Sequence, residues 1–307
     1  MTGDGLQDPL WEHFSPLWTD LSPIASDDLL VAGGYGLYLK QRFLRANPTL
    51  PIVVPLDRWL DATPRVTKDL DLVIGLQLIA AQERHQSILD ALNRNGFRVS
   101  DRPSGRRWQF VKTLLDSRVV LVELHAPRPE NSHPTVMATE QRVKHKPSLG
   151  DAGIHGRTNP EAAGCELSPF RFELDGITAA VVNPVTWSVM KLTAMDDRWS
   201  GAQDSVSIDN VRTFARQQAI KHAHDVCRII ASMTRSELEA AELVRDSLRN
   251  TPPFSRVVSI WNDAFRNEMT PPALSAMRNW ALEDFEIIRG IGNRWFVQAD
   301  SDSAGSK

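Results

Sequence analysis

The sequence contains few cysteines and no long apolar run, and both absences narrow the class of protein. Cys165 and Cys227 are its two cysteines in 307 residues, so we expect no disulfide framework and a reducing compartment. No apolar stretch approaches the length that spans a bilayer, and no signal-peptide pattern opens the chain. These features predict a soluble, cytoplasmic protein with no membrane partner.

Positive charge is missing from the start of the chain and is concentrated in its middle. Residues 1–30 carry six acidic side chains and no Lys or Arg, whereas residues 101–160 carry ten Lys or Arg against six Asp or Glu. The net charge of −3 argues against a protein that coats nucleic acid along its whole length. A polyanionic ligand would therefore meet the middle of the chain.

The predicted secondary structure changes from mixed strands and helices to helices alone near residue 183. The sequence shows no internal repeat. Residues 1–182 mix short strands with helices, residues 183–298 read as helices, and the small polar tail 299–307 reads as disordered. A chain of this length accommodates two moderate domains. We predict an α+β protein with a mixed sheet flanked by helices in the first domain and a helical bundle in the second.

Local patterns predict the elements of each domain. In the first domain we expect strands at 28–32, 67–74, 108–115, 118–126 and 171–182, the last interrupted by a turn at Asp175-Gly176, with one helix after the glycines at 33–34 and another over 76–95. A Pro-rich connection at 47–64 loops out between them. In the second domain we expect a helix from Asn183-Pro184 to about residue 198, and further helices over 207–233, 236–248 and 271–290.

Two carboxylates interrupt the apolar strand in PRVTKDLDLVI. Residues i and i+2 of a strand share a face, so Asp69 and Asp71 present their carboxylates side by side. Mg²⁺ relieves the repulsion between such a pair, because it prefers oxygen ligands and completes its shell with water and phosphate oxygens. Arg65 and Lys68 just upstream would offset charge or contact a polyphosphate. The alternative is an exposed strand end whose acidic residues face water.

A strand, a glycine turn and a helix precede this pair. In VAGGYGLYL, Gly33 and Gly34 allow close approach of a ligand to the backbone, and the N-terminus of the following helix offers N–H groups to phosphate. The stretch is neither a Walker loop nor a complete G-x-G-x-x-G fingerprint. Together with the carboxylate pair it predicts a glycine turn for a triphosphate and carboxylates for its metal ion.

These elements resemble the polymerase-β-like nucleotidyltransferases, and most closely their AbiEii-type toxin branch. The resemblance covers roughly residues 28–230, through a GG turn and an R-x-T-x-D-x-D strand, a helical lysine in WSVMKLTAMDDR, and a Lys/Asp pair in AIKHAHDV. The matching residues are Gly33, Gly34, Arg65, Thr67, Asp69, Asp71, Lys191, Lys221 and Asp225. The chain departs from the pattern in a longer gap between the glycines and the carboxylates, and in having Glu123 on the later strand where the family normally has an aspartate as its third acid.

The resemblance implies a Mg²⁺-dependent nucleotidyltransferase that uses an NTP. It implies that Asp69 and Asp71 bind one or two Mg²⁺ ions and that Gly33, Gly34, Arg65, Thr67, Lys68 and Lys221 contact the nucleotide. Lys191 would neutralise phosphate charge, or else be a solvated helical lysine. The third acid is either Glu123, as a metal ligand on a later strand, or Asp225, which would otherwise form an exposed helical ion pair with Lys221.

The resemblance also implies a toxin of toxin-antitoxin type, with a cognate antitoxin and an RNA acceptor such as tRNA. An RNA backbone would also favour the basic residues that the segments DRPSGRRW and QRVKHKP concentrate, although solvated loop charge is the alternative. These residues are Arg102, Arg106, Arg107, Arg142, Lys144 and Lys146. His125 shares the face of Glu123, as a helper or a core histidine. A protein or small-molecule acceptor, and a catalytically degenerate nucleotide-binding scaffold, are the other two hypotheses.

Overall fold

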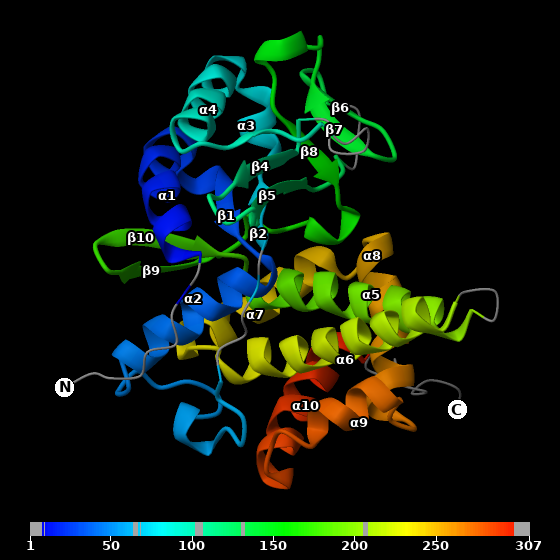
Figure 1. The fold of residues 1–307 in the computed structure, drawn as a ribbon. Coiled ribbons are helices and arrows are strands. Elements are labelled where there is room, and N and C mark those ends of the chain that lie inside the picture. The colour runs from blue at the N-terminus through cyan, green and yellow to red at the C-terminus, as the bar shows by residue number, and fades with distance from the viewer. Residues whose placement is uncertain are drawn as a thin grey trace. The chain divides into compact units, whose positions relative to one another are not determined.

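The computed structural model describes residues 8, 10–63, 67, 69–101, 107–129, 133–204 and 208–297. The chain forms two compact units, the first made of residues 1–46 and 64–183 and the second of residues 47–63 and 184–307. Figure 1 shows the helices and strands of each unit. The α+β prediction, with a mixed sheet and flanking helices followed by a helical second half, is confirmed.

The connection at 47–63 belongs to the second unit, although the sequence interpretation assigned it to the first domain. The backbone N–H groups of Val53 and Val54 donate to the carbonyl oxygens of Met233 (2.9 Å) and Ala231 (3.0 Å). The ring of Trp59 lies 4.9 Å, centroid to centroid, from that of Trp280. The segment therefore leaves the first unit and packs among the C-terminal helices.

A mixed sheet forms the centre of the first unit. Its strands are β1 (Leu29–Val31), β2 (Asp69–Ile74), β3 (Arg98–Val99), β4 (Gln109–Thr113), β5 (Val119–Ala126), β6 (Val136–Ala138), β7 (Arg142–His145), β8 (His155–Thr158), β9 (Phe170–Leu174) and β10 (Ile177–Val181). The main path runs β6-β7-β8-β5-β2-β1-β10-β9, and β4 pairs with both β5 and β3. The pairs β2/β5, β5/β8 and β1/β10 are parallel and the others are antiparallel.

The described residues of the first unit also form the α-helices α1 (Trp11–Ala25), α2 (Gly33–Ala46), α3 (Leu76–Ala80) and α4 (Gln82–Arg94). The sequence interpretation missed α1, whose Phe14 ring lies 5.1 Å from the ring of Tyr35 on α2. The single helix expected over 76–95 is wrong, because Ala81, with φ −82° and ψ 81°, separates α3 from α4. Gly96 ends α4 with a positive φ of 82°, as the Asn-Gly pair predicts.

Strands β6, β7 and β8 were not expected from the sequence. The basic segment QRVKHKP, interpreted as a loop, contains β7, which pairs with β6 on one side and β8 on the other. Val143 is fully buried and its neighbours on the strand are partly exposed, so the alternation is present over only four residues. Such a short alternation gives too weak a pattern to be distinguished from a polar loop.

Helices make up the second unit: α5 (Pro184–Gln203), α6 (Asp209–Ala231), α7 (Arg235–Leu248), α8 (Pro252–Trp261), a π-helical turn η5 (Asn262–Arg266), α9 (Pro271–Met277) and α10 (Leu282–Phe296). The longest two, α5 and α6, pack against each other. Its aromatic core includes Trp261 and Phe265, which stack at 4.6 Å. The helix expected over 271–290 is divided between α9 and α10. None of the helices in the described residues has the length and hydropathy needed to cross a bilayer.

Candidate active site

Strand β2 presents Asp69 and Asp71 on one face of the sheet and Leu70, Leu72 and Ile74 on the other. Leu70 and Leu72 are buried at 0 % and 1 % exposure, whereas Asp69 is exposed and the side chain of Asp71 is 32 % exposed. The alternation follows from the two-residue period of a strand with one covered face. Both carboxylates therefore lie where a ligand in solvent can reach them.

The glycine turn before α2 lies directly against Asp71. Gly33 has a positive φ of 61°, and a Cβ atom at this position would overlap the carboxylate of Asp71. The N–H of Ala32 donates to the Asp71 carbonyl at 2.8 Å, which fixes the end of β1 to β2. Residue 33 must therefore be glycine for two reasons: its backbone conformation and the space that Asp71 occupies.

Strand β5 adds a third carboxylate beside Asp71. Glu123 is the register partner of Asp71 in the parallel β2/β5 pair, so the two side chains share a face. Its side chain is 10 % exposed, and both of its oxygens are engaged: Arg157 Nη1 lies 2.8 Å from Oε1, and Gln109 Nε2 donates to Oε2 at 2.9 Å. Glu123 is thus a buried carboxylate held by an arginine and an amide.

His125 lies between the two acids, on the face that the sequence predicts. Its Nε2 is 3.5 Å from Asp71 Oδ1 and 3.8 Å from Glu123 Oε1. When protonated, the imidazole would offset charge from either carboxylate. His125 is the register partner of Arg157 on the neighbouring strand β8. The side chains on this face therefore change from acidic on β2 and β5 to basic on β8.

The carboxylate pair fits Mg²⁺ better than a metal held by protein groups alone. Across the described residues there is no set of three His, Cys, Asp or Glu side chains arranged to hold a metal ion. Mg²⁺ needs only one or two carboxylates, with water and substrate phosphate for its other ligands. Asp69 and Asp71 can supply them, whereas Glu123 is already held by Arg157 and Gln109.

The other predicted nucleotide contacts of the first unit are Thr67, Gly34, Arg65 and Lys68. Thr67 Oγ1 lies 3.4 Å from the N–H of Asp69, a local contact at the start of β2. Arg65 and Lys68 lie outside the described residues. Gly34 is buried in the first turn of α2, where helix N–H groups point out of the helix end.

Lys191 and Asp225, which the sequence interpretation placed in the active site, form a buried ion pair within the second unit. Lys191 Nζ on α5 lies 2.8 Å from Asp225 Oδ2 on α6, and the two side chains are 7 % and 1 % exposed. The alternatives of a solvated Lys191 and of an exposed Asp225 pair are therefore wrong. Lys221 is half-buried one turn earlier on α6 and lies 3.5 Å from Gln218.

Two other side chains of α6, His224 and Cys227, have structural roles. His224 accepts from Asn279 at Nδ1 (2.8 Å) and lies 3.2 Å from Ser275 through Nε2, and burial lowers its pKa. Cys227 is fully buried, and burial raises its pKa to about 12. A thiol with so high a pKa is not a nucleophile at neutral pH.

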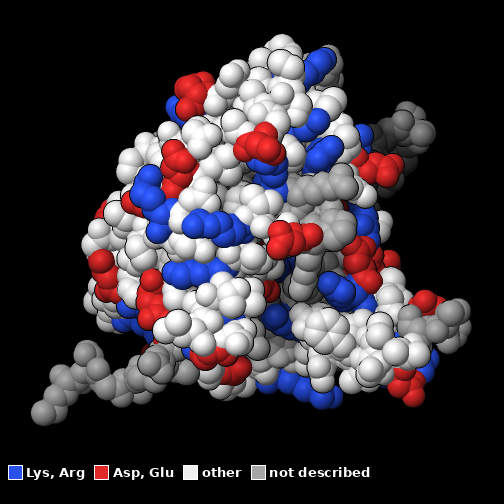
Figure 2. Space-filling model, turned by 45° about the horizontal axis from the view of Figure 1, so that its top comes forward, with Lys and Arg blue, Asp and Glu red and all other residues white. Residues whose placement is uncertain are grey.

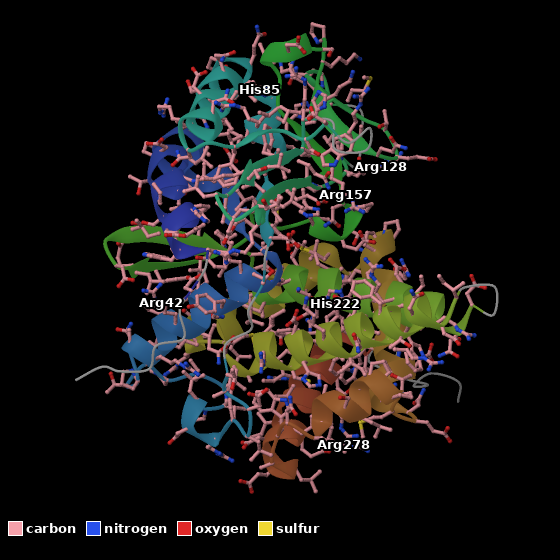
Figure 3. The ribbon with its side chains drawn as sticks, viewed as in Figure 1. Arg42, His85, Arg128, Arg157, His222 and Arg278 are labelled. Atoms are coloured by element: carbon pink, nitrogen blue, oxygen red, sulfur yellow. The ribbon has the colours of Figure 1, made fainter. Side chains whose placement is uncertain are left out.

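Two residues of the site, Gln109 and Arg157, were not identified from the sequence. Gln109 opens β4 and is the register partner of Glu123, while Arg157 comes from β8. Figure 3 shows Arg157 with Arg128 on the same side of the first unit. The hairpin about Asp116-Ser117 could have pointed to Gln109, because pairing around that turn brings 109 opposite 123. No local pattern pointed to Arg157.

Comparisons with known proteins add little to this geometry. No family model matches the sequence, and no curated protein matches it. A solved structure of an antigenic nucleotidyltransferase-like protein from Paracoccidioides brasiliensis is similar at 14 % identity and a TM-score of 0.33, over 82 % of this chain and 98 % of that chain. At that TM-score the similarity supports no inference about activity.

Proposed function

We propose that this protein is a Mg²⁺-dependent nucleotidyltransferase of toxin-antitoxin type, which transfers NMP from an NTP to an RNA acceptor such as tRNA. The observation that carries the proposal is the contact between Gly33 and the Asp71 carboxylate. It joins a glycine turn at a helix N-terminus, which suits phosphate, to a pair of solvent-accessible carboxylates, which suits Mg²⁺.

The reaction requires the protein to align the reactants and to offset charge on the phosphate oxygens, and it requires little covalent chemistry from the protein. A hydroxyl oxygen of the acceptor forms a bond to the α-phosphorus, its proton leaves to solvent or a carboxylate, and the bond to the β-phosphate breaks to release pyrophosphate. Asp69 and Asp71 would hold Mg²⁺, which stabilises the developing negative charge. The N–H groups that open α2 would hold the phosphates.

The remaining predicted residues have roles that follow from charge. Arg65, Lys68 and Lys221 would contact the triphosphate, with Thr67 at the entry to β2. Lys191 would neutralise phosphate charge only by leaving its pair with Asp225, which costs the compensation of a buried carboxylate. We therefore assign Lys191 and Asp225 first to the stability of the second unit and propose a catalytic role as their second.

A second candidate function is a scaffold that binds nucleotide without transfer. It is favoured by the engagement of both Glu123 oxygens, because a third acid held by Arg157 and Gln109 does not add a ligand to the metal. Under this hypothesis Asp69 and Asp71 still bind Mg²⁺-nucleotide, and no acceptor is modified.

Incubation of the purified protein with each α-³²P-labelled NTP, Mg²⁺ and total tRNA tests the proposal. Wild-type protein should move label onto RNA with one or more nucleotides, and Asp69→Asn/Asp71→Asn should reduce the rate by at least a hundredfold. The matched control is Asp116→Asn/Asp175→Asn, which removes the same charge at two exposed turn positions of the same unit. Label on a protein or a small molecule would show that the acceptor is not RNA. Nucleotide binding without transfer to any acceptor would support the scaffold that binds nucleotide without catalysis.

A further inference from the structure

The sheet face that carries the carboxylates continues into a row of cations on the next two strands. His125 is the register partner of Arg157 on β8, and Arg157 is the register partner of Arg142 on β7. Register partners share a face, and so do residues two apart on a strand, so Lys144 joins the same face. We call Arg142, Lys144 and Arg157 the basic strip.

The strip reaches the surface, and among the described residues two of its three cations have no carboxylate within salt-bridge distance. Arg157 is 57 % exposed at its side chain although it is paired with Glu123, whereas Arg142 and Lys144 are partly buried. In the part of the chain that the structure describes, no carboxylate lies within salt-bridge distance of Arg142 or Lys144. Arg128, exposed just beyond β5, adds a further cation near the end of the strip.

Several other surface arginines of the first unit are paired with a carboxylate. Arg94 lies 3.3 Å from Asp20, and Arg118 lies 2.6 Å from Asp116. On the face drawn in Figure 2, Lys and Arg side chains are interspersed with Asp and Glu. Ion pairs are therefore common on this unit, whereas Arg142 and Lys144 are two cations on one sheet face with no carboxylate within salt-bridge distance among the described residues.

Glu123 gives the strip a fixed end. A carboxylate that is 10 % exposed is costly unless it is paired and hydrogen-bonded. Here it accepts from Gln109 and from Arg157, so the guanidinium is held over β5 while more than half of the Arg157 side chain stays open to solvent. A held guanidinium loses less conformational entropy when it binds phosphate than a free one does.

We propose that the basic strip binds the phosphate backbone of the RNA acceptor, with Glu123 as the positioning residue for Arg157. The identity of the ligand as the RNA acceptor rests on the proposed function. The binding test below does not depend on nucleotidyl transfer. Neighbouring strands are about 4.8 Å apart, so Arg142 on β7 lies roughly 14 Å across the sheet from Asp71 on β2. A strand of RNA crossing the strip would run toward the carboxylate pair.

Binding of fluorescently labelled total tRNA, without NTP, tests the strip independently of transfer. Anisotropy titrations of wild type and Arg142→Gln/Lys144→Gln over a series of salt concentrations give both Kd and its salt dependence. Removing one phosphate contact lowers the slope of log K against log salt by about 0.7–0.9. The double variant should therefore bind more weakly at low salt and have a slope smaller by roughly 1.4–1.8.

The matched control is Arg94→Gln/Arg118→Gln, which removes the same charge from α4 and from the β4–β5 turn. The slope of log K against log salt for this control should differ from that of the wild type by less than the change expected for the loss of one phosphate contact. Retention of Mg²⁺-nucleotide binding by Arg142→Gln/Lys144→Gln, in equilibrium dialysis, shows that the variant is folded and that the strip is separate from the nucleotide site.

Two results would overturn the proposal. The first is an unchanged Kd and slope in Arg142→Gln/Lys144→Gln, or an equal weakening in the control. The second is loss of nucleotide binding with tRNA binding retained, which would make the strip a triphosphate site. If wild type binds tRNA through the strip but transfers no label, the proposed activity fails while the strip stands.

Discussion

Gly33 and Asp71 are 38 positions apart in the sequence and lie in contact in the fold. The contact exists because β1 and β2 pair in antiparallel register and the N–H of Ala32, directly after β1, donates to the Asp71 carbonyl, which brings Gly33 beside the Asp71 side chain. The carboxylate fills the space where any other residue would place its Cβ. Side-chain chemistry on β2 therefore depends on a missing side chain at the start of α2.

Gly33→Ala should displace Asp71 and reduce nucleotidyl transfer by at least tenfold. The substitution also forces a left-handed φ on alanine, which costs about 1–2 kcal/mol. Gly150→Ala separates the two effects, because Gly150 has a similar φ of 57° and open space around it. We expect Gly150→Ala to lose only the unfolding free energy that the backbone conformation costs, and Gly33→Ala to lose more because of the overlap with Asp71 and to be the one variant that loses transfer. Equal activity in the two would show that the contact has no functional role.

Glu123→Gln and Arg157→Gln should show coupled effects on tRNA binding. If Glu123 acts by holding Arg157, Arg157→Gln weakens binding by roughly tenfold, a size typical of a hydrogen bond to a charged group, and Glu123→Gln by less. The double variant should then bind no more weakly than Arg157→Gln alone. Additive effects would instead give Glu123 an independent role, such as metal ligation, which the Mg²⁺ dependence of nucleotide binding would reveal.

Lys191→Met should destabilise the second unit by about 3–5 kcal/mol, since it leaves the buried carboxylate of Asp225 without its cation. Replacing both, as in Lys191→Met/Asp225→Leu, should recover much of that stability, because neither charge then remains buried. Urea unfolding of the two single variants and the double variant gives the coupling energy. Near-additive changes would argue against the ion pair as the main role of these residues.

His85 should make the stability of the first unit depend on pH. The N–H of Ile154 donates to Nδ1 at 3.1 Å, so Nε2 carries the proton and donates to the Ile79 carbonyl at 3.0 Å. Burial lowers the pKa of this imidazole from its usual 6.5, and the nearby His145 acts in the same direction while Glu83 opposes it.

Below pH 6.5 the unfolded chain therefore binds a proton that folded His85 does not, and stability falls as pH falls. The free energy of unfolding should be lower at about pH 5.5 than at about pH 7.5. Since burial also lowers the pKa of His13 and His224, the comparison is with His85→Gln, which should be less stable throughout but change less between the two pH values. An identical pH dependence in wild type and variant would exclude His85 as a source.

Elements with a strong local signal were predicted well from the sequence. The strand, glycine turn and helix from residue 29, the carboxylate strand β2, and the hairpins about 116 and 175 follow from turn residues and alternation that lie within a few positions. The face shared by Asp69 and Asp71 needed only the two-residue period of a strand. The same local reasoning failed at Ala81, where no proline or glycine marks the end of α3.

By itself the sequence determined the α+β class, the carboxylate pair on β2 and the glycines that precede it, because each is encoded by neighbouring residues. Only the tertiary structure decided the contacts between distant residues. These contacts are Glu123 beside Asp71, Arg157 on Glu123, Lys191 on Asp225, and the packing of residues 47–63 with the C-terminal helices. Strand order and helix packing set those contacts, and both depend on interactions between residues far apart in the chain, which leave no periodic trace in it.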